Sequence, residues 1–141
     1  MRLPFGQARR QRDARRRALL DGEPVAVSGR LRRTSARGWG AWTDTVVSLG
    51  PPPDGPARWR VDDPIAVGLP STHGPVSATF IEIGEVYVRP VRFRTEAFWG
   101  MDADIVVLTS ERGTTELAFP QDLTAPVAAR LRELFGLDDV R

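Results

Sequence analysis

The chain has 141 residues, which indicates one domain, and no cysteine, which excludes disulfides, thiolate catalysis and cysteine-bound zinc or iron–sulfur clusters. Its charge is divided unevenly: residues 1–40 hold 11 arginines and three acids, a net charge of +8, whereas residues 41–141 hold nine arginines and 15 acids, a net charge of −6. A basic N-terminal segment followed by an acidic remainder indicates either an anionic partner or an N-terminal arm that packs on the acidic remainder of the chain.

Residues 7–20 (QARRQRDARRRALL) are good helix formers, and the run stops at Asp21-Gly22. Large apolar side chains are few and lie only at or beyond the two ends of the run, so no apolar stripe is available to face a core. We therefore expect a solvated basic arm over residues 1–22, either helical or disordered. Its central arginines are Arg9, Arg10, Arg12, Arg15, Arg16 and Arg17.

Alternating apolar and polar residues then predict strands. The first half of the chain has this pattern at 24–33, 41–49 and 57–61, with loops at 34–40 and 62–76 and a sharp proline-glycine break at 50–56. In the first strand the inward face is expected to hold Val25, Val27, Gly29 and Leu31. Arg30 and Arg32 should point outward, while Arg33 continues the inward face unless the strand ends there.

The second half of the chain predicts four more strands, at 78–83, 85–94, 104–110 and 114–119. Val86 and Val88 are in phase, but the apolar residues after Pro90 are not. Pro90 therefore indicates a bulge or an edge position. The last two strands should form a hairpin with Gly113 where a positive φ is wanted.

The final element is an amphipathic helix. Thr124 is a candidate cap, Pro126 fits the first turn, and Gly136 ends the helix. The expected apolar face is Val127, Leu131, Leu134 and Phe135, and the expected water-facing residues are Arg130, Arg132 and Glu133.

This order predicts a mainly β domain: about seven antiparallel strands in a small barrel or sandwich, with one C-terminal helix covering an open end. The expected organisation is a basic arm at 1–22, a single domain at 23–137 and a tail at 138–141.

The ending DADIVVLTSERGTTELAFPQDLTAPVAARLRELFG, two strands, a tight turn and a closing helix, resembles the pleckstrin-homology-like fold. The resemblance implies a pleckstrin-homology-like barrel with its C-terminal helix.

More narrowly, residues 24–136 resemble a family of small actinobacterial domains of unknown function. The matching pieces are SLGPPPDGPARW, IVVLTSERGTTELAF and the closing helix. Members of that family usually begin with a transmembrane helix followed by arginines. Here the arginines are present and the span is not.

Catalytic and metal chemistry find little support in the chain. The single histidine, His73, has no identifiable partner, and Ser71 and Thr72 beside it do not make a triad. The carboxylate pairs at Asp62-Asp63, Asp102/Asp104 and Asp138-Asp139 fit turns and termini, and none has calcium-loop spacing. We therefore expect no catalytic residues, no metal and no cofactor.

A phosphate-facing surface is the better candidate. Arg30, Arg32, Arg33 and Arg37 cluster at the end of the first strand and its loop, close to Trp39 and Trp42. Pleckstrin-homology-like domains that bind phosphoinositides carry basic residues in this same hairpin, so the resemblance implies an anion site at Arg30, Arg32 and Arg37. A solvated arginine face is the alternative.

The expected function is a non-catalytic adaptor or scaffold at the inner membrane face, steered by the basic arm toward anionic lipid. Nucleic acid is a less favoured partner for the same arm because the body is acidic. A protein-only adaptor, binding through a sheet edge near Pro90 or a groove beside the last helix, is a third reading. The longest uncharged run, 64–81, is broken by prolines and glycines and predicts no membrane span, and no secretory signal opens the chain. The expected location is therefore cytoplasmic with membrane association.

Overall fold

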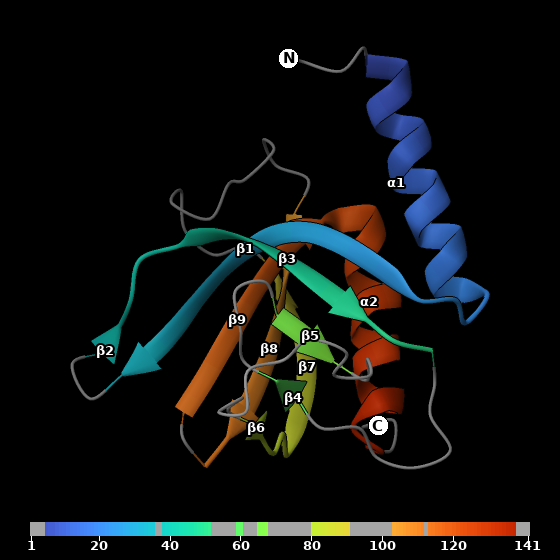
Figure 1. The fold of residues 1–141 in the computed structure, drawn as a ribbon. Helices are drawn as coiled ribbons and strands as arrows, with labels where there is room; N and C mark the ends of the chain where they lie inside the picture. The colour runs from blue at the N-terminus through green and yellow to red at the C-terminus, as the bar shows by residue number, and fades with distance from the viewer. Residues whose placement is uncertain are drawn as a thin grey trace.

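The computed structural model describes residues 5–35, 38–51, 59–60, 65–67, 80–90, 103–111 and 113–137. These residues form two helices and nine strands (Figure 1). In chain order the elements are α1 (Phe5–Leu20), β1 (Val25–Ser35), β2 (Gly38–Trp39), β3 (Thr43–Leu49), β4 (Trp59–Arg60), β5 (Ile65–Val67), β6 (Phe80–Ile81), β7 (Glu85–Pro90), β8 (Ala103–Ser110), β9 (Gly113–Pro120) and α2 (Gln121–Leu134).

The strands join in one sheet of order β6-β4-β5-β3-β1-β9-β8-β7, with β2 paired to β1. The mainly β class and the single C-terminal helix are confirmed. The described strands number nine rather than about seven, because short pieces add to the predicted set. No ladder joins the end strands β6 and β7 in the described residues, so closure into a barrel stays a prediction.

Two predicted loops contain short strands. Ile65–Val67, in the stretch predicted as loop, is fully buried and runs parallel to β3. Gly38–Trp39 folds back on the end of β1, with Gly38 at a φ of 105°. Both segments are too short for alternation to reveal them, and their flanks are rich in proline or glycine.

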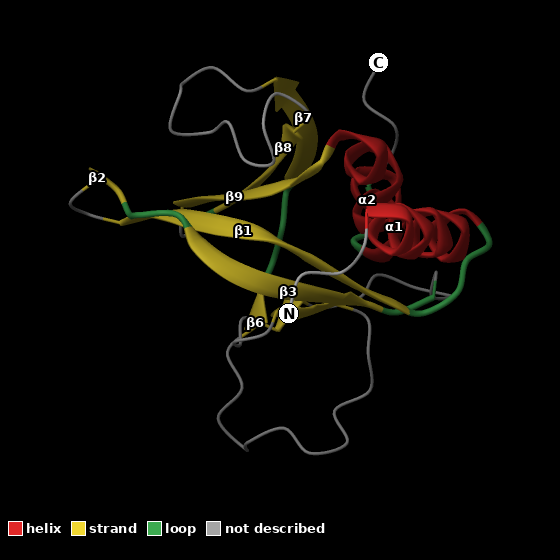
Figure 2. Cartoon of the chain, turned by 90° about the horizontal axis from the view of Figure 1, so that it is seen from above, coloured by secondary structure: helices red, strands yellow, loops and turns green. Residues whose placement is uncertain are grey.

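Helix α2 covers one face of the sheet and forms the core with it (Figure 2). The apolar face of α2 is buried as predicted and packs against the inward side chains of β1, β3, β8 and β9. The helix begins at Gln121 with Pro120 as its N-cap, so the prediction of Thr124 as cap is wrong. The buried Thr124 hydroxyl instead donates to the Pro120 carbonyl at 3.2 Å, and Pro126 lies inside the helix.

The end of α2 is as expected. Gly136 has a φ of 68°, the Leu137 N–H donates to the Arg132 carbonyl at 2.8 Å, and the Gly136 N–H donates to the Glu133 carbonyl. This pair of bonds is a Schellman motif, which needs the left-handed conformation that glycine adopts at little cost.

Strands β8 and β9 form the predicted hairpin, with Ser110 opposite Gly113 and Gly113 at a φ of 128°. The central residues of β8, Ile105 to Leu108, are buried on both faces of the sheet. Strand β7 pairs only with β8 among the described residues, so Pro90 lies on an edge strand. Of the two positions predicted for Pro90, a bulge or an edge, the structure shows the edge. Val86 is buried, but its phase partner Val88 is exposed.

Gly29 of β1 lies against β9. A Cβ at this position would stand 2.5 Å from the Ala118 carbonyl oxygen and 2.9 Å from the Phe119 ring. Gly29→Ala is therefore expected to lower the free energy of unfolding by about 1–3 kcal/mol, because the backbone oxygen cannot move aside. Urea denaturation measures this loss. Gly84→Ala is the matched control, since its Cβ would meet nothing within 4 Å and should cost far less. Equal losses would contradict this account.

Candidate functional site

The six arginines of the basic arm lie on α1, which stands beside α2 and extends past the start of α2 (Figure 1). The prediction of a wholly solvated arm is wrong in one respect, because α1 packs on the body. Arg10, Arg16 and Arg17 are exposed, whereas Arg12 and Arg15 are half-buried. Arg9 lies in the helix, but its side chain is outside the described part of the chain.

The half-buried arginines point toward the body. Arg15 Nε donates to the Ala26 carbonyl of β1 at 3.1 Å, and Arg12 Nε is fully buried. The two side chains lie on the side of the helix that also carries Leu19, which is 6% exposed and joins the core. The docked helix therefore presents only part of its positive charge to an external partner.

The C-terminal end of α1 is closed by a second Schellman motif, at the predicted Asp21-Gly22 stop. The Glu23 N–H donates to the Ala18 carbonyl at 2.9 Å, and Gly22 has a φ of 76°. The turn directs the chain into β1 and gives the helix a defined end.

Arg130 of α2 holds this end of α1, so the prediction that Arg130 faces water is wrong: the residue is 2% exposed. Its Nη1 donates to the carbonyls of Glu23 and Gly50 at 2.8 and 2.7 Å. Its Nη2 donates to the carbonyls of Ala18 and Leu19 at 3.2 and 2.9 Å. One guanidinium thus joins α1, the turn after it and the end of β3.

The electrostatics of Arg130 suit this position. Burial lowers the pKa of Arg130, and Glu133 on the same helix partly opposes that shift. The guanidinium stays charged at neutral pH, and its charge meets the negative end of the α1 dipole.

The arginines of the predicted anion site on β1 lie in different environments. Arg30 points outward and pairs with the exposed Asp44 at 3.4 Å. Arg32 also points outward, but its guanidinium is engaged by Glu116. Arg33 faces inward as predicted, and burial lowers its pKa. Arg37 lies outside the described residues, so the structure does not bring the predicted set together.

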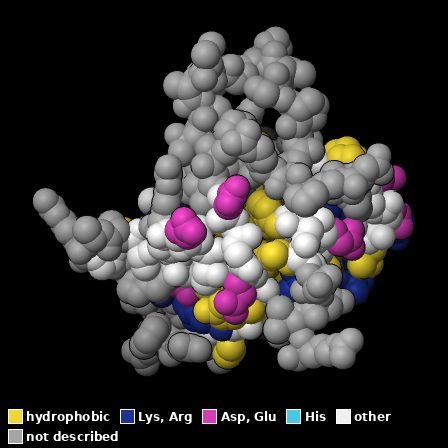
Figure 3. All heavy atoms as spheres, turned by 90° about the horizontal axis from the view of Figure 1, so that it is seen from below, with side chains coloured by type: hydrophobic (Ala, Val, Ile, Leu, Met, Phe, Trp, Pro, Cys, Tyr) yellow, Lys and Arg dark blue, Asp and Glu magenta, His cyan; other side chains and the backbone are white. Residues whose placement is uncertain are grey.

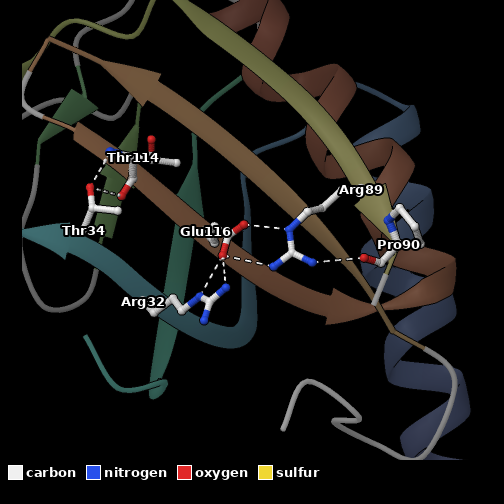
Figure 4. A network of polar contacts seen from close by, with 6 residues as sticks. All are labelled: Arg32, Thr34, Arg89, Pro90, Thr114 and Glu116. Atoms are coloured by element: carbon white, nitrogen blue, oxygen red, sulfur yellow. Dashed lines mark hydrogen bonds and ion pairs between the residues drawn. The ribbon is translucent and has the colours of Figure 1, made fainter. Parts of the chain in front are cut away.

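Glu116 is the centre of a buried ionic network on the sheet face opposite α2 (Figure 4). Arg32 donates from Nε to Oε1 at 2.7 Å, and its Nη2 lies 2.6 Å from the same oxygen. Arg89 donates from Nε to Oε2 at 2.7 Å and from Nη2 to Oε1 at 3.0 Å. Glu116 is 3% exposed and Arg89 is 7% exposed, so both charges depend on one another.

Register explains how the network forms. Arg32 on β1 is directly opposite Glu116 on β9, and Arg89 on β7 reaches Glu116 across β8. The Arg32 guanidinium also stacks over Trp42, 4.8 Å from the ring centroid. Arg32 is therefore held by contacts within the domain, and these contacts tie β1 to β9.

Sequence reasoning missed Arg89, Glu116 and Arg130. A signal existed for two of them. Glu116 lies within a strand paired to the continuous apolar run Ile105–Leu108, whose burial on both faces requires any central charge to be paired. Arg130 is three residues after Val127 and four before Leu134, which places it on the apolar face.

Several predicted features lie outside the described residues: Ser71, Thr72, His73, Asp62-Asp63, Asp102 and Asp138-Asp139. Within the described ranges, no three His, Asp or Glu side chains gather as metal ligands would. Nor does either described helix combine the length and apolar character needed to cross a membrane.

Comparisons of the chain with protein-family models, with curated proteins and with solved structures gave no match.

Proposed function

We propose that the chain is a non-catalytic, pleckstrin-homology-like binding domain that docks on anionic lipid at the inner membrane face through α1. The observation that carries the proposal is the fixed presentation of Arg10, Arg16 and Arg17 on a helix anchored to the body by Arg130. The β-sheet closed on one face by a C-terminal helix supports the fold relationship.

The exposed charge is sufficient for reversible binding. Each arginine near an anionic leaflet contributes about 1 kcal/mol, and salt screens the effect within a Debye length. Asp13, also exposed on α1, subtracts from this sum. Binding through α1 should therefore be readily reversible and salt-sensitive.

The other end of the molecule favours one orientation on such a surface. Acidic side chains are spread, among basic ones, over the face seen from below in Figure 3, at the end away from the start of α1. Glu82, Glu85, Glu111 and Glu133 are the exposed acids of the β6–β7 turn, the β8–β9 turn and the end of α2. A negatively charged surface repels this end and attracts α1.

The protein-only reading is less favoured because the β7 edge is blocked at several points. Arg132 donates to the Val86 carbonyl at 3.1 Å, Arg89 Nη1 donates to the Pro90 carbonyl at 3.0 Å, and Pro90 has no N–H to offer. An incoming strand would lose these backbone partners. Nucleic acid remains the runner-up for the α1 face.

The test is co-sedimentation with vesicles. Replacing Arg10, Arg16 and Arg17 together by glutamine should weaken binding to anionic vesicles about 100-fold at low salt, because roughly 3 kcal/mol of attraction is removed. Replacing the same three by lysine keeps the charge and should retain binding. Neutral vesicles should not bind either protein.

Duplex DNA as competitor separates the partners. If the chain binds anionic vesicles and DNA displaces it only slightly, the result supports lipid as the partner. Retention by DNA without vesicle binding would replace the proposal with the nucleic-acid reading. Binding to neither would leave a protein partner as the explanation for the domain.

A further inference from the structure

The two leucines at the end of α1 have opposite environments. Leu19 is 6% exposed and lies in the core, whereas its neighbour Leu20 is 62% exposed. Leu20 is among the large apolar side chains that the described residues expose, and it exceeds the others in exposed fraction. An isolated exposed leucine needs no explanation by itself, so its surroundings decide whether it has a role.

Two exposed arginines surround Leu20 on the helix. Arg16 is four residues before it and Arg17 three, so all three side chains lie on neighbouring positions of one side of α1. The Schellman turn at Gly22 and the hydrogen bonds that Arg130 donates to α1 fix this end of the helix. The leucine is therefore held outward beside two cations.

This arrangement matches the boundary between lipid headgroups and acyl chains. Arginine guanidinium groups bind phosphate while their methylene stems and a neighbouring leucine lie in the more apolar layer. The backbone of duplex DNA has phosphates but offers no comparable apolar layer beneath them. We infer that Leu20 inserts into the acyl boundary of an anionic bilayer when α1 docks, an inference that rests on the proposed function and specifies its contact.

A matched pair of substitutions tests the contact. Leu20→Ser should weaken binding to anionic vesicles about tenfold, because most of a leucine's transfer free energy is lost. Gln11→Ser is the control: Gln11 is exposed on α1 and, nine residues before Leu20, lies on the opposite side of the helix. Both variants should keep the melting temperature of the parent chain because both side chains are exposed.

A position-specific readout uses the absence of native cysteine. Leu20→Cys and Gln11→Cys are each labelled with a polarity-sensitive fluorophore and mixed with anionic vesicles. Insertion predicts a blue shift at position 20, a much smaller one at position 11, and none at either position with duplex DNA.

The outcomes separate the inference from the proposed function. Vesicle binding with no shift at position 20 and an unchanged affinity for Leu20→Ser would overturn insertion and leave electrostatic docking intact. Equal losses for Leu20→Ser and Gln11→Ser would also overturn insertion. Failure of the parent chain to bind anionic vesicles would overturn both.

Discussion

Replacing Arg130 with methionine is expected to free α1 from the body and to lower the free energy of unfolding by about 3 kcal/mol or more. The side chain is buried and its four described hydrogen bonds end on carbonyls of α1, the segment after it and Gly50, which follows β3. Methionine fills similar volume but donates nothing, so those carbonyls lose a charged partner in a buried site.

Two matched variants make the Arg130 result interpretable. Arg132→Met, two residues further along α2, removes the described hydrogen bond to the Val86 carbonyl and should cost about 1 kcal/mol. Arg130→Lys keeps the charge, but one ammonium cannot reach carbonyls of three segments, so most of the loss should remain. Urea denaturation gives the stabilities, and hydrogen exchange over residues 12–20 reports whether α1 has opened.

The same variant links stability to the proposed function. An undocked α1 would keep its arginines but lose their fixed arrangement. We expect vesicle binding to weaken even at temperatures where the sheet stays folded. If Arg130→Met leaves the amide protection of α1 unchanged, Arg130 does not hold α1 on the body, whatever happens to global stability.

The arm shows why the candidate site was only partly predictable. Composition alone located the cluster of arginines, and the Asp21-Gly22 stop fixed the end of the helix. Which arginines face outward depends on how α1 docks. That depends on backbone carbonyls at residues 18, 19, 23 and 50, which every sequence possesses and no side-chain pattern reveals.

The sheet shows a similar division. Period-two patterns predicted the inward face of β1 and the β8–β9 hairpin, because long strands with one clear phase carry a strong signal. They missed β5, where three consecutive buried residues have no alternation, and the role of Arg89, which becomes clear only when β7, β8 and β9 are placed in register.

Glu116→Gln is the second substitution with a large expected effect, a loss of about 3–5 kcal/mol in the free energy of unfolding. Glutamine preserves the shape of the side chain but removes the only carboxylate that the described contacts place between Arg32 and Arg89. Arg32 can shift along Trp42 toward water, since it is only half-buried, whereas Arg89 is 7% exposed and has no comparable path. The loss in the free energy of unfolding should therefore come mainly from the buried charge of Arg89.

A double substitution tests that assignment. If the loss arises because the buried Arg89 no longer faces the Glu116 carboxylate, adding Arg89→Met to Glu116→Gln should recover part of the stability, although each substitution alone is destabilising. Thr114→Ala supplies a control on the same strand, since it leaves intact the hydrogen bond that the Thr114 N–H donates to Thr34. Urea denaturation of the four proteins completes the double-mutant cycle. Additive losses at positions 89 and 116 would mean that the two side chains do not depend on one another, and Arg89 would then not belong to one buried ionic unit with Glu116.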